Sequence, residues 1–389
     1  MLFIVWLGLG KAEAQTVYTW TGGSNGAWNV PANWTPTRTT PDISDELIVG
    51  SGGSVTIHTF ATESVNGLRV SGNTDLTIEA ASVNQTLNVK NGPGLNDLDV
   101  QSGSSLSIGT NVNLLMLHAS HFLVASGADL IIGASRSFSV TNYADNTGTI
   151  NGNLTIEGSL NIGASALVTV NGMIINNPSS TSVATGAACL NFSATGIYEH
   201  RRAGGSFVNA TWDPNAEARV IVPAGASGTI ALSGGQTFGK FFWNSPAQTT
   251  TVSLGLSSTT NFNTSFDIVS TGTGEMSLAT AAATVNFNCD LNVSGTSTMS
   301  INTGSNVVSL YVTRDLNIAA GATLQYGSST SNQLIYFNSA GIDRNINNTG
   351  TLDGTRLSIY VNLGSVNTMM HDITGLTGPF YVNGTLKMQ

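Results

Sequence analysis

The sequence predicts an all-β fold: a single-stranded parallel β-helix (β-solenoid) with an N-terminal aromatic cap and a lateral insertion module. The first supporting observation is a repeat. The stretches beginning at Phe266, Asp290 and Asp315 each combine a short apolar/polar alternation, a Gly/Ser/Thr turn and a second alternation. A period in the low twenties with short strands is typical of coils that stack on one another.

Composition is the second observation. The chain has 389 residues, of which 44 are Gly, 9 are Pro and 9% are charged, against about 25% charged residues in ordinary globular proteins. Glycine supplies positive φ and asparagine tolerates left-handed backbone, so this mixture favours many short strands joined by tight turns. Runs of strong helix formers at helical spacing are missing from the sequence, which argues against long helices.

The third observation is a period-two alternation that runs from about residue 55 to residue 170, in triplets such as Leu76-Thr77-Ile78 and Leu106-Ser107-Ile108. Successive side chains of a strand point to opposite faces, so we expect the aliphatic residues inside and the Thr, Ser and Asn residues outside. About fourteen coils rising ~4.8 Å each would make a rod roughly 70 Å long.

We divide the chain into five segments, each with its own predicted role. They are a signal peptide (1–14), an N-terminal cap (15–54), a first β-solenoid block (55–197), an interrupting β module (198–256) and a second β-solenoid block (257–389). The signal prediction rests on an apolar run from Leu2 to Leu7 followed by Ala12-Glu13-Ala14, an A-x-A cleavage site. A buried strand is the alternative for this stretch. Cleavage would imply a secreted protein, extracellular or on the outer cell surface.

Three tryptophans, Trp20, Trp28 and Trp34, fall within fifteen residues. They could form a ring-stacking platform for a sugar. They could also cover the apolar core and strand edges that the first coil of a solenoid leaves open. We favour the cap.

Four further groups of residues need a chemical interpretation. His118 and His121 could share a metal ion, but positions three apart on a strand face opposite sides. A Glu199–His200 pair could act in acid–base catalysis, or Tyr198, His200 and Trp212 could pack a lateral bulge with the neighbouring arginines paired to Glu199 and Asp213. We favour packing.

Asp267, Asp290 and Asp315 are expected to stack at corresponding corners. They could bind calcium, or accept backbone N–H groups in turns, which is the simpler account. Cys189 and Cys289 should lie several coils apart, beyond the ~7 Å that a disulfide spans between Cα atoms, so we predict two buried free thiols. We therefore assign no catalytic, cofactor-binding or metal-binding residues, and expect no cofactor.

The stretch from Tyr198 to Gln248 carries Tyr-x-His, Gly-Gly, Ala-Thr-Trp (210–212) and Gln-x-Phe-Gly-x-Phe-x-Trp-Asn (236–244). It resembles a module of large surface proteins that Gram-negative bacteria export by type IX secretion. Asp213-Pro214 stands where those proteins usually have a cysteine after the tryptophan, and their C-terminal sorting domain is missing here. The resemblance implies surface display and an adhesive or structural role, without catalytic residues.

The net charge of −9, with only four lysines, makes nucleic acid an improbable partner, and we expect no membrane insertion. We expect a non-enzymatic stalk, adhesin or matrix component. Its partners would be copies of itself or other surface components, with glycans a further option. One alternative is a filament subunit that stacks head to tail. Another is a β-helical polysaccharide lyase or hydrolase, which would need clustered carboxylates and a basic group on one face.

Overall fold

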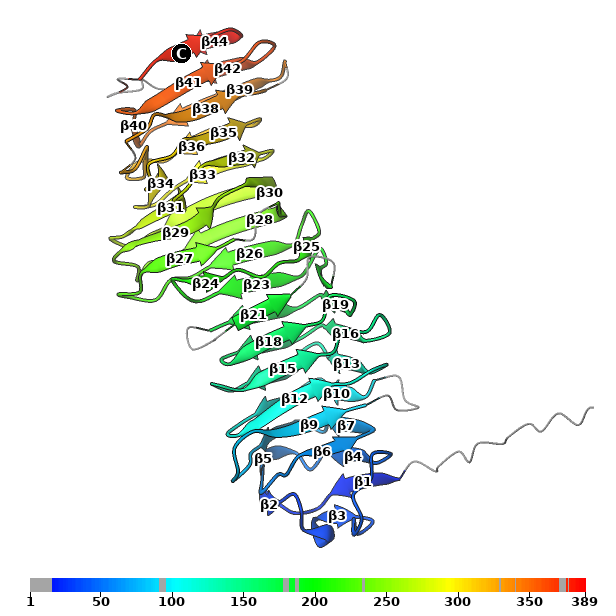
Figure 1. Cartoon of the computed structure of the whole chain (residues 1–389). Helices are drawn as coiled ribbons and strands as arrows, with labels where there is room; N and C mark the ends of the chain where they lie inside the picture. The colour runs from blue at the N-terminus through cyan, green and yellow to red at the C-terminus, as the bar shows by residue number, and fades with distance from the viewer. Residues whose placement is uncertain are drawn as a thin grey trace, which may run out of the picture.

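The structure is a computed structural model of the chain. It describes residues 16–90, 96–177, 182–185, 189–232, 235–328, 330–339, 341–370, 376 and 378–389. These residues form a long rod of stacked coils, with β1 at one end and β44 at the other (Figure 1). The all-β prediction is confirmed, with about 13 turns and about 1% helix.

Each coil contributes strands to three faces that run the length of the rod. Along each face, a strand pairs in parallel with the corresponding strand of the coil before and the coil after. The exception among the described strands is the antiparallel pairing of β1 (Val17–Trp20) with β3 (Trp34–Thr35). The 3-10 helix η1 (Pro31–Asn33) precedes β3.

Face 1 begins with a ten-stranded sheet and continues through two long strands into the second half of the rod. Its strands are β1, β3, β4 (Glu46–Val49), β7 (Gly67–Val70), β10 (Leu98–Val100), β13 (His121–Val124), β16 (Thr147–Ile150), β19 (Leu167–Val170), β22 (Leu190–Phe192), β25 (Thr211–Trp212), the first halves of β28 (Thr237–Asn244) and β30 (Thr259–Ser270), β32 (Ala283–Phe287), β35 (Val308–Val312), β38 (Gln333–Phe337), β41 (Leu357–Val361) and β43 (Phe380–Val382).

Face 2 has an unbroken series of parallel pairings. Its strands are β2 (Asn25–Ala27), β5 (Gly53–His58), β8 (Thr74–Ile78), β11 (Ser105–Ile108), β14 (Asp129–Ile132), β17 (Asn153–Ile156), β20 (Met173–Asn176), β23 (Ile197–His200), β26 (Glu217–Val220), the second halves of β28 and β30, β33 (Asp290–Val293), β36 (Leu316–Ile318), β39 (Asp343–Asn348), β42 (Val366–Met369) and β44 (Thr385–Met388).

Face 3 consists of a six-stranded sheet followed by a seven-stranded sheet. The first holds β6 (Glu63–Val65), β9 (Gln85–Val89), β12 (Val112–Met116), β15 (Ser137–Val140), β18 (Ser159–Ile162) and β21 (Ser182–Thr185). The second holds β24 (Gly205–Ser206), β27 (Gly228–Ala231), β29 (Thr251–Leu256), β31 (Glu275–Ala279), β34 (Thr298–Asn302), β37 (Thr323–Gln325) and β40 (Thr351–Asp353).

The core is a set of columns in which each coil places one inward side chain against the next. On face 2 one such column is buried at every coil from Leu76 to Ile346, and it passes through Leu76, Leu106, Leu130, Leu154, Ile174, Tyr198, Ala218, Phe241, Phe266, Leu291, Leu316 and Ile346. A single coil is too thin to bury these groups, so the hydrophobic free energy is gained only when coils stack.

The segment 198–256 belongs to this stack. Its strands β23, β26 and β28 pair in parallel with the coils on both sides. The sequence led us to expect a module set to one side of the rod. What changes here is the corner between faces 1 and 2: β28 and β30 each cross it as one continuous strand, with a register shift in their pairing between Phe238 and Lys240. The segment stays in the stack because its inward residues Tyr198, Ala218 and Phe241 continue the buried column of face 2.

The register corrects the expectation that Asp267, Asp290 and Asp315 stack at corresponding corners. Asp290 and Asp315 precede the paired residues Leu291 and Leu316, but Asp267 pairs with Asn292 instead of Asp290. The apolar residues decide this alignment, because a two-residue slip would take Phe266 off the Leu291–Leu316 column. Asp267 therefore heads an amide ladder: Asn292 donates to its carboxylate at 2.7 Å, and Asn317 donates to Asn292 at 2.8 Å.

The two remaining aspartates behave as turn acceptors. Asp290 Oδ1 accepts the backbone N–H of Asp315 at 3.3 Å and the Arg314 guanidinium at 3.2 Å. Asp315 Oδ1 accepts the backbone N–H of Asn345 at 3.0 Å. Of the two roles that the sequence suggested, calcium binding and acceptance of backbone N–H groups, these contacts fit the second.

The prediction for the cysteines is confirmed: Cys189 and Cys289 are both free and buried. Burial, together with the charges of Asp290 and Asp267, raises the pKa of the Cys289 thiol to about 12. A thiol that stays protonated is a poor nucleophile, so this group acts as a small apolar core residue.

Candidate functional site

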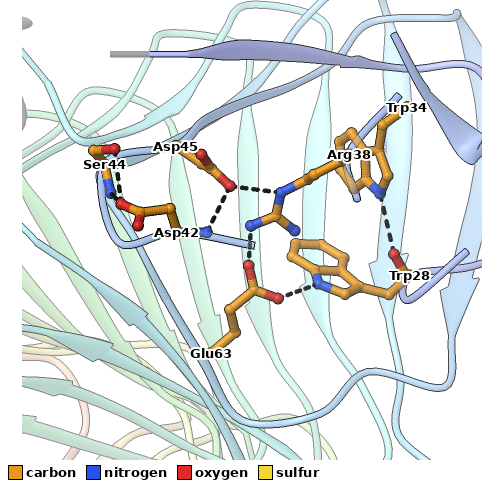
Figure 2. Close-up of polar contacts among 7 residues, drawn as sticks. All are labelled: Trp28, Trp34, Arg38, Asp42, Ser44, Asp45 and Glu63. Carbon is orange, nitrogen blue, oxygen red and sulfur yellow. Dashed lines mark hydrogen bonds and ion pairs between the residues drawn. The ribbon is translucent and has the colours of Figure 1, made fainter. Parts of the chain in front are cut away.

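A cleft of ≈ 510 Å³ lies at the N-terminal end of the rod. One wall of the cleft is the loop that contains Thr39, Pro41 and Ile43, and Ala61 and Thr62, between β5 and β6, line it as well. The loop wall is fixed by Arg38, whose side chain turns back into the protein. Trp28 and Glu63 line the cleft beside it (Figure 2).

Arg38 is the centre of a buried ionic network. Its Nε donates to Asp45 Oδ2 at 2.7 Å, and its Nη2 donates to Glu63 Oε1. Glu63 Oε2 in turn accepts the indole N–H of Trp28 at 2.7 Å. The guanidinium also lies 5.7 Å from the Tyr18 ring centroid and 5.8 Å from that of Trp34, within cation–π range.

Two pKa shifts follow from this geometry. Burial acts to lower the pKa of Arg38, but the hydrogen bonds and charges of Glu63 and Asp45 outweigh it and raise that pKa above its ordinary value. Two hydrogen bonds from Ser44 hold the pKa of exposed Asp42 below its ordinary value. Both groups keep their charge, and both Glu63 oxygens already accept a hydrogen bond. These contacts tie the loop at Arg38 to Asp45, Glu63 and Trp28.

The three tryptophans pack edge to face in a single cluster. The ring of Trp34 lies 5.0 Å from Trp20 and 5.3 Å from Trp28, and Phe60 extends the contact from Trp28. Each tryptophan is only 2% exposed. The three rings pack against one another and are closed to solvent, so a sugar platform made of these three rings is excluded. Their role as a cap stays a prediction.

The Glu199–His200 pair is split by the strand on which it lies. Glu199 faces outward, where Arg201 donates to it and Arg219 approaches within 3.9 Å. His200 faces the core, with Nδ1 3.2 Å from the Tyr198 hydroxyl and Nε2 3.2 Å from the Gly204 carbonyl oxygen. Burial lowers the pKa of His200 to about 3. The two groups therefore cannot serve one substrate as an acid–base pair.

The sequence also led us to expect an arginine paired with Asp213, but the contacts of Asp213 and Arg219 show a different arrangement. Asp213 Oδ1 accepts the backbone N–H of Asn215 at 2.8 Å in a turn, and Arg219 also pairs with Glu217 at 2.5 Å. Tyr198, His200 and Trp212 are buried in the stack itself.

Residues of the Tyr-x-His to Trp-Asn stretch have structural roles. Gln236 Oε1 accepts the backbone N–H of Ala210 at 3.2 Å and the indole N–H of Trp212 at 3.1 Å. A Cβ at Gly239 would stand 2.5 Å from the carbonyl oxygens of Asp213 and Pro214, so only glycine fits there. These contacts join consecutive coils, which explains the residue types without a catalytic role.

His118 and His121 have separate partners. His118 Nε2 lies 3.2 Å from Asp145, and its ring packs against Tyr143. His121 Nδ1 lies 2.7 Å from the Thr147 hydroxyl, on outer face 1. In the described part of the chain, no group of three or more His, Cys, Asp or Glu side chains is arranged to hold a metal ion.

Sequence reasoning missed a charged ladder on outer face 1. Arg69 Nε donates to Asp99 at 3.2 Å, and its Nη2 lies 3.6 Å from Glu46. In the next column, Asp97 accepts the backbone N–H of His121 at 2.6 Å. These residues are 20 to 30 positions apart in the chain, so the only signal for them would have been the register between coils.

Within the described residues, no helix combines the length and apolar character that crossing a bilayer demands. No protein-family model matches the chain, and searches of curated proteins and of solved structures return no similar protein.

Proposed function

We propose that this chain is a non-enzymatic structural or adhesive β-solenoid outside the cell, acting as a stalk, adhesin or matrix component. The observation that supports it best is the buried column on face 2, which runs without a break from Leu76 to Ile346. A continuous core of this kind makes a stiff rod, because bending it would separate coils that bury each other's apolar faces.

Two features of the sequence support the location. The apolar start with Ala12-Glu13-Ala14 fits an export signal, and the 198–248 stretch resembles modules of surface proteins exported by type IX secretion. A surface poor in charge and rich in Thr, Ser and Asn is compatible with both.

Protease treatment of intact source cells tests the location, and electron microscopy of the purified chain tests the form. We expect the chain to be cleaved on intact cells and to appear as single short rods. A chain protected inside intact cells would overturn the proposal, and long fibres would favour the filament subunit.

A glycan-cleaving enzyme is the second candidate, and the Glu46–Arg69–Asp99 ladder is the observation that favours it. It places carboxylates and a basic group on one face, which such enzymes require. A screen on uronate and neutral polysaccharides decides between the two. Sugar release that is lost in Asp99→Asn would establish the enzyme and refute the non-enzymatic proposal.

A further inference from the structure

Outer face 1 carries a row of four tyrosines near the C-terminal end of the rod. Tyr311, Tyr336, Tyr360 and Tyr381 occupy one register column on β35, β38, β41 and β43. Their rings stack with centroids 4.8 Å apart at each step and interplanar angles of 12°, 22° and 16°. We call this row the tyrosine ladder.

The spacing leaves part of each ring face uncovered. Aromatic carbon atoms in contact are about 3.5–4.0 Å apart, so rings whose centroids are 4.8 Å apart must be offset. Tyr311, Tyr336 and Tyr360 are half-buried, and Tyr381 is 48% exposed. The ladder therefore presents a repeating series of aromatic surface and hydroxyl groups along the rod axis.

The surroundings of the ladder are uncharged. The remaining outward register positions of β32, β35, β38 and β41 are Thr284, Asn286, Ser309, Leu334 and Ser358. Arg314 and Arg356 lie beyond the strand ends, where Asp290 and the Thr330 carbonyl oxygen engage them. A ligand that lies along these strands therefore meets no charged side chain at their outward positions.

The Tyr336 hydroxyl stays protonated. Burial, together with the neighbouring Tyr311 and Tyr360, raises the pKa of Tyr336 above its ordinary value. This phenol can thus donate as well as accept a hydrogen bond.

We propose that the tyrosine ladder binds an extended, uncharged polysaccharide lying along the rod axis. Sugar rings offer C–H faces that pack on aromatic faces, and hydroxyl groups that pair with the Tyr hydroxyls and with Ser309. A polymer of repeating sugars also matches a surface that repeats once per coil. The proposal deepens the adhesive part of the proposed function and rests on it for its extracellular setting.

The test measures binding of the purified full chain to cellulose, xylan, mannan, chitin and β-1,3-glucan, with polygalacturonate and alginate as anionic counterparts. We expect binding to at least one uncharged polymer and at least tenfold weaker binding to the anionic ones. For oligosaccharides of the bound polymer, affinity should rise with length until the ladder is spanned. Binding should change little with added salt, because no charge is engaged.

Variants locate the site. Tyr336→Ala and Tyr360→Ala should each weaken binding at least tenfold, whereas Tyr336→Phe, which keeps the ring, should retain most of it. Tyr143→Ala is the matched control: Tyr143 is 47% exposed, lies outside the ladder and packs on His118. Thermal unfolding of each variant checks that it is folded.

The proposal fails if no uncharged polymer binds, if anionic polymers bind equally well, or if Tyr143→Ala weakens binding as much as Tyr336→Ala. It also fails if the ladder variants change the oligomeric state of the chain, because the face would then bind a second copy. These measurements use purified protein, so their failure leaves the protease test of cellular location untouched.

Discussion

At the scale of single residues, inward positions were predictable and partners across coils were not. Alternation alone predicts that Leu76, Leu106 and Leu154 point inward, and all three are buried. The contact between Arg38 and Glu63 joins residues 25 positions apart, through a loop whose path the sequence does not specify. The split of Glu199 from His200 follows from the strand period, once the strand itself is recognised.

Gly148 illustrates how tightly the core is filled. It stands opposite Phe122 on face 1, and a Cβ there would lie 2.0 Å from Phe122 Cε1. We expect Gly148→Ala to lower the free energy of unfolding by about 1–3 kcal/mol through overpacking. Chemical denaturation measures this. Gly204→Ala is the control, since its nearest neighbour would be 3.6 Å away; equal losses in both variants would show that Phe122 does not cover Gly148.

His200 should make stability depend on pH. Its pKa is about 3 in the folded chain and 6.5 ordinarily, so between these values the unfolded chain binds a proton that the folded chain excludes. The free energy of unfolding should therefore fall as the pH drops from 6.5 towards 3, by at most about 1.4 kcal/mol per pH unit.

Denaturant titrations of wild type and His200→Gln across this pH range measure the effect. The variant should lose a large part of the acid destabilisation, because the amide does not titrate. The same substitution at His58, which follows the inward Ile57 on β5, controls for the loss of one histidine. An unchanged pH slope in His200→Gln would place the titrating group elsewhere.

At the scale of elements, strands were predictable and corners were not. A corner between faces varies in length and shape, so coils cannot be aligned by counting residues or by matching aspartates. Asp267 shows this: it resembles Asp290 in sequence but pairs with Asn292. The merging of two faces in β28 and β30 was not predicted either: in β28 the alternation slips by one residue at Phe238 and Gly239, which are both buried, and the strand continues across the corner.

The loop that contains Thr39, Pro41 and Ile43 is anchored by the side chain of Arg38. Arg38→Met would leave Asp45 and Glu63 without their buried partner, and breaking a buried ion pair in this way costs about 3–5 kcal/mol. Thermal or denaturant unfolding should show this loss. Arg314→Met removes the exposed pair with Asp290, and we expect about 0–1 kcal/mol there. Comparable losses would mean that the Arg38 network is solvated.

At the scale of the whole molecule, the low-twenties period was sufficient to predict a stacked rod, because no single coil can bury its own apolar face. The same logic explains why the 198–256 segment stays in the stack. Its inward residues Tyr198, Ala218 and Phe241 continue the buried column, and a module set aside from the rod would leave that column open.

Cysteine crosslinking along one column tests the stacked register most directly. Asp267, Asn292 and Asn317 are register partners on consecutive coils. Neighbouring coils are ~4.8 Å apart and alternate coils ~9.6 Å, while a disulfide spans at most about 7 Å between Cα atoms. Cysteines at 267/292 and at 292/317 should form disulfides within one chain under mild oxidation, whereas cysteines at 267/317 should not. Disulfides at 267/317, or none at the two neighbouring pairs, would contradict the stack.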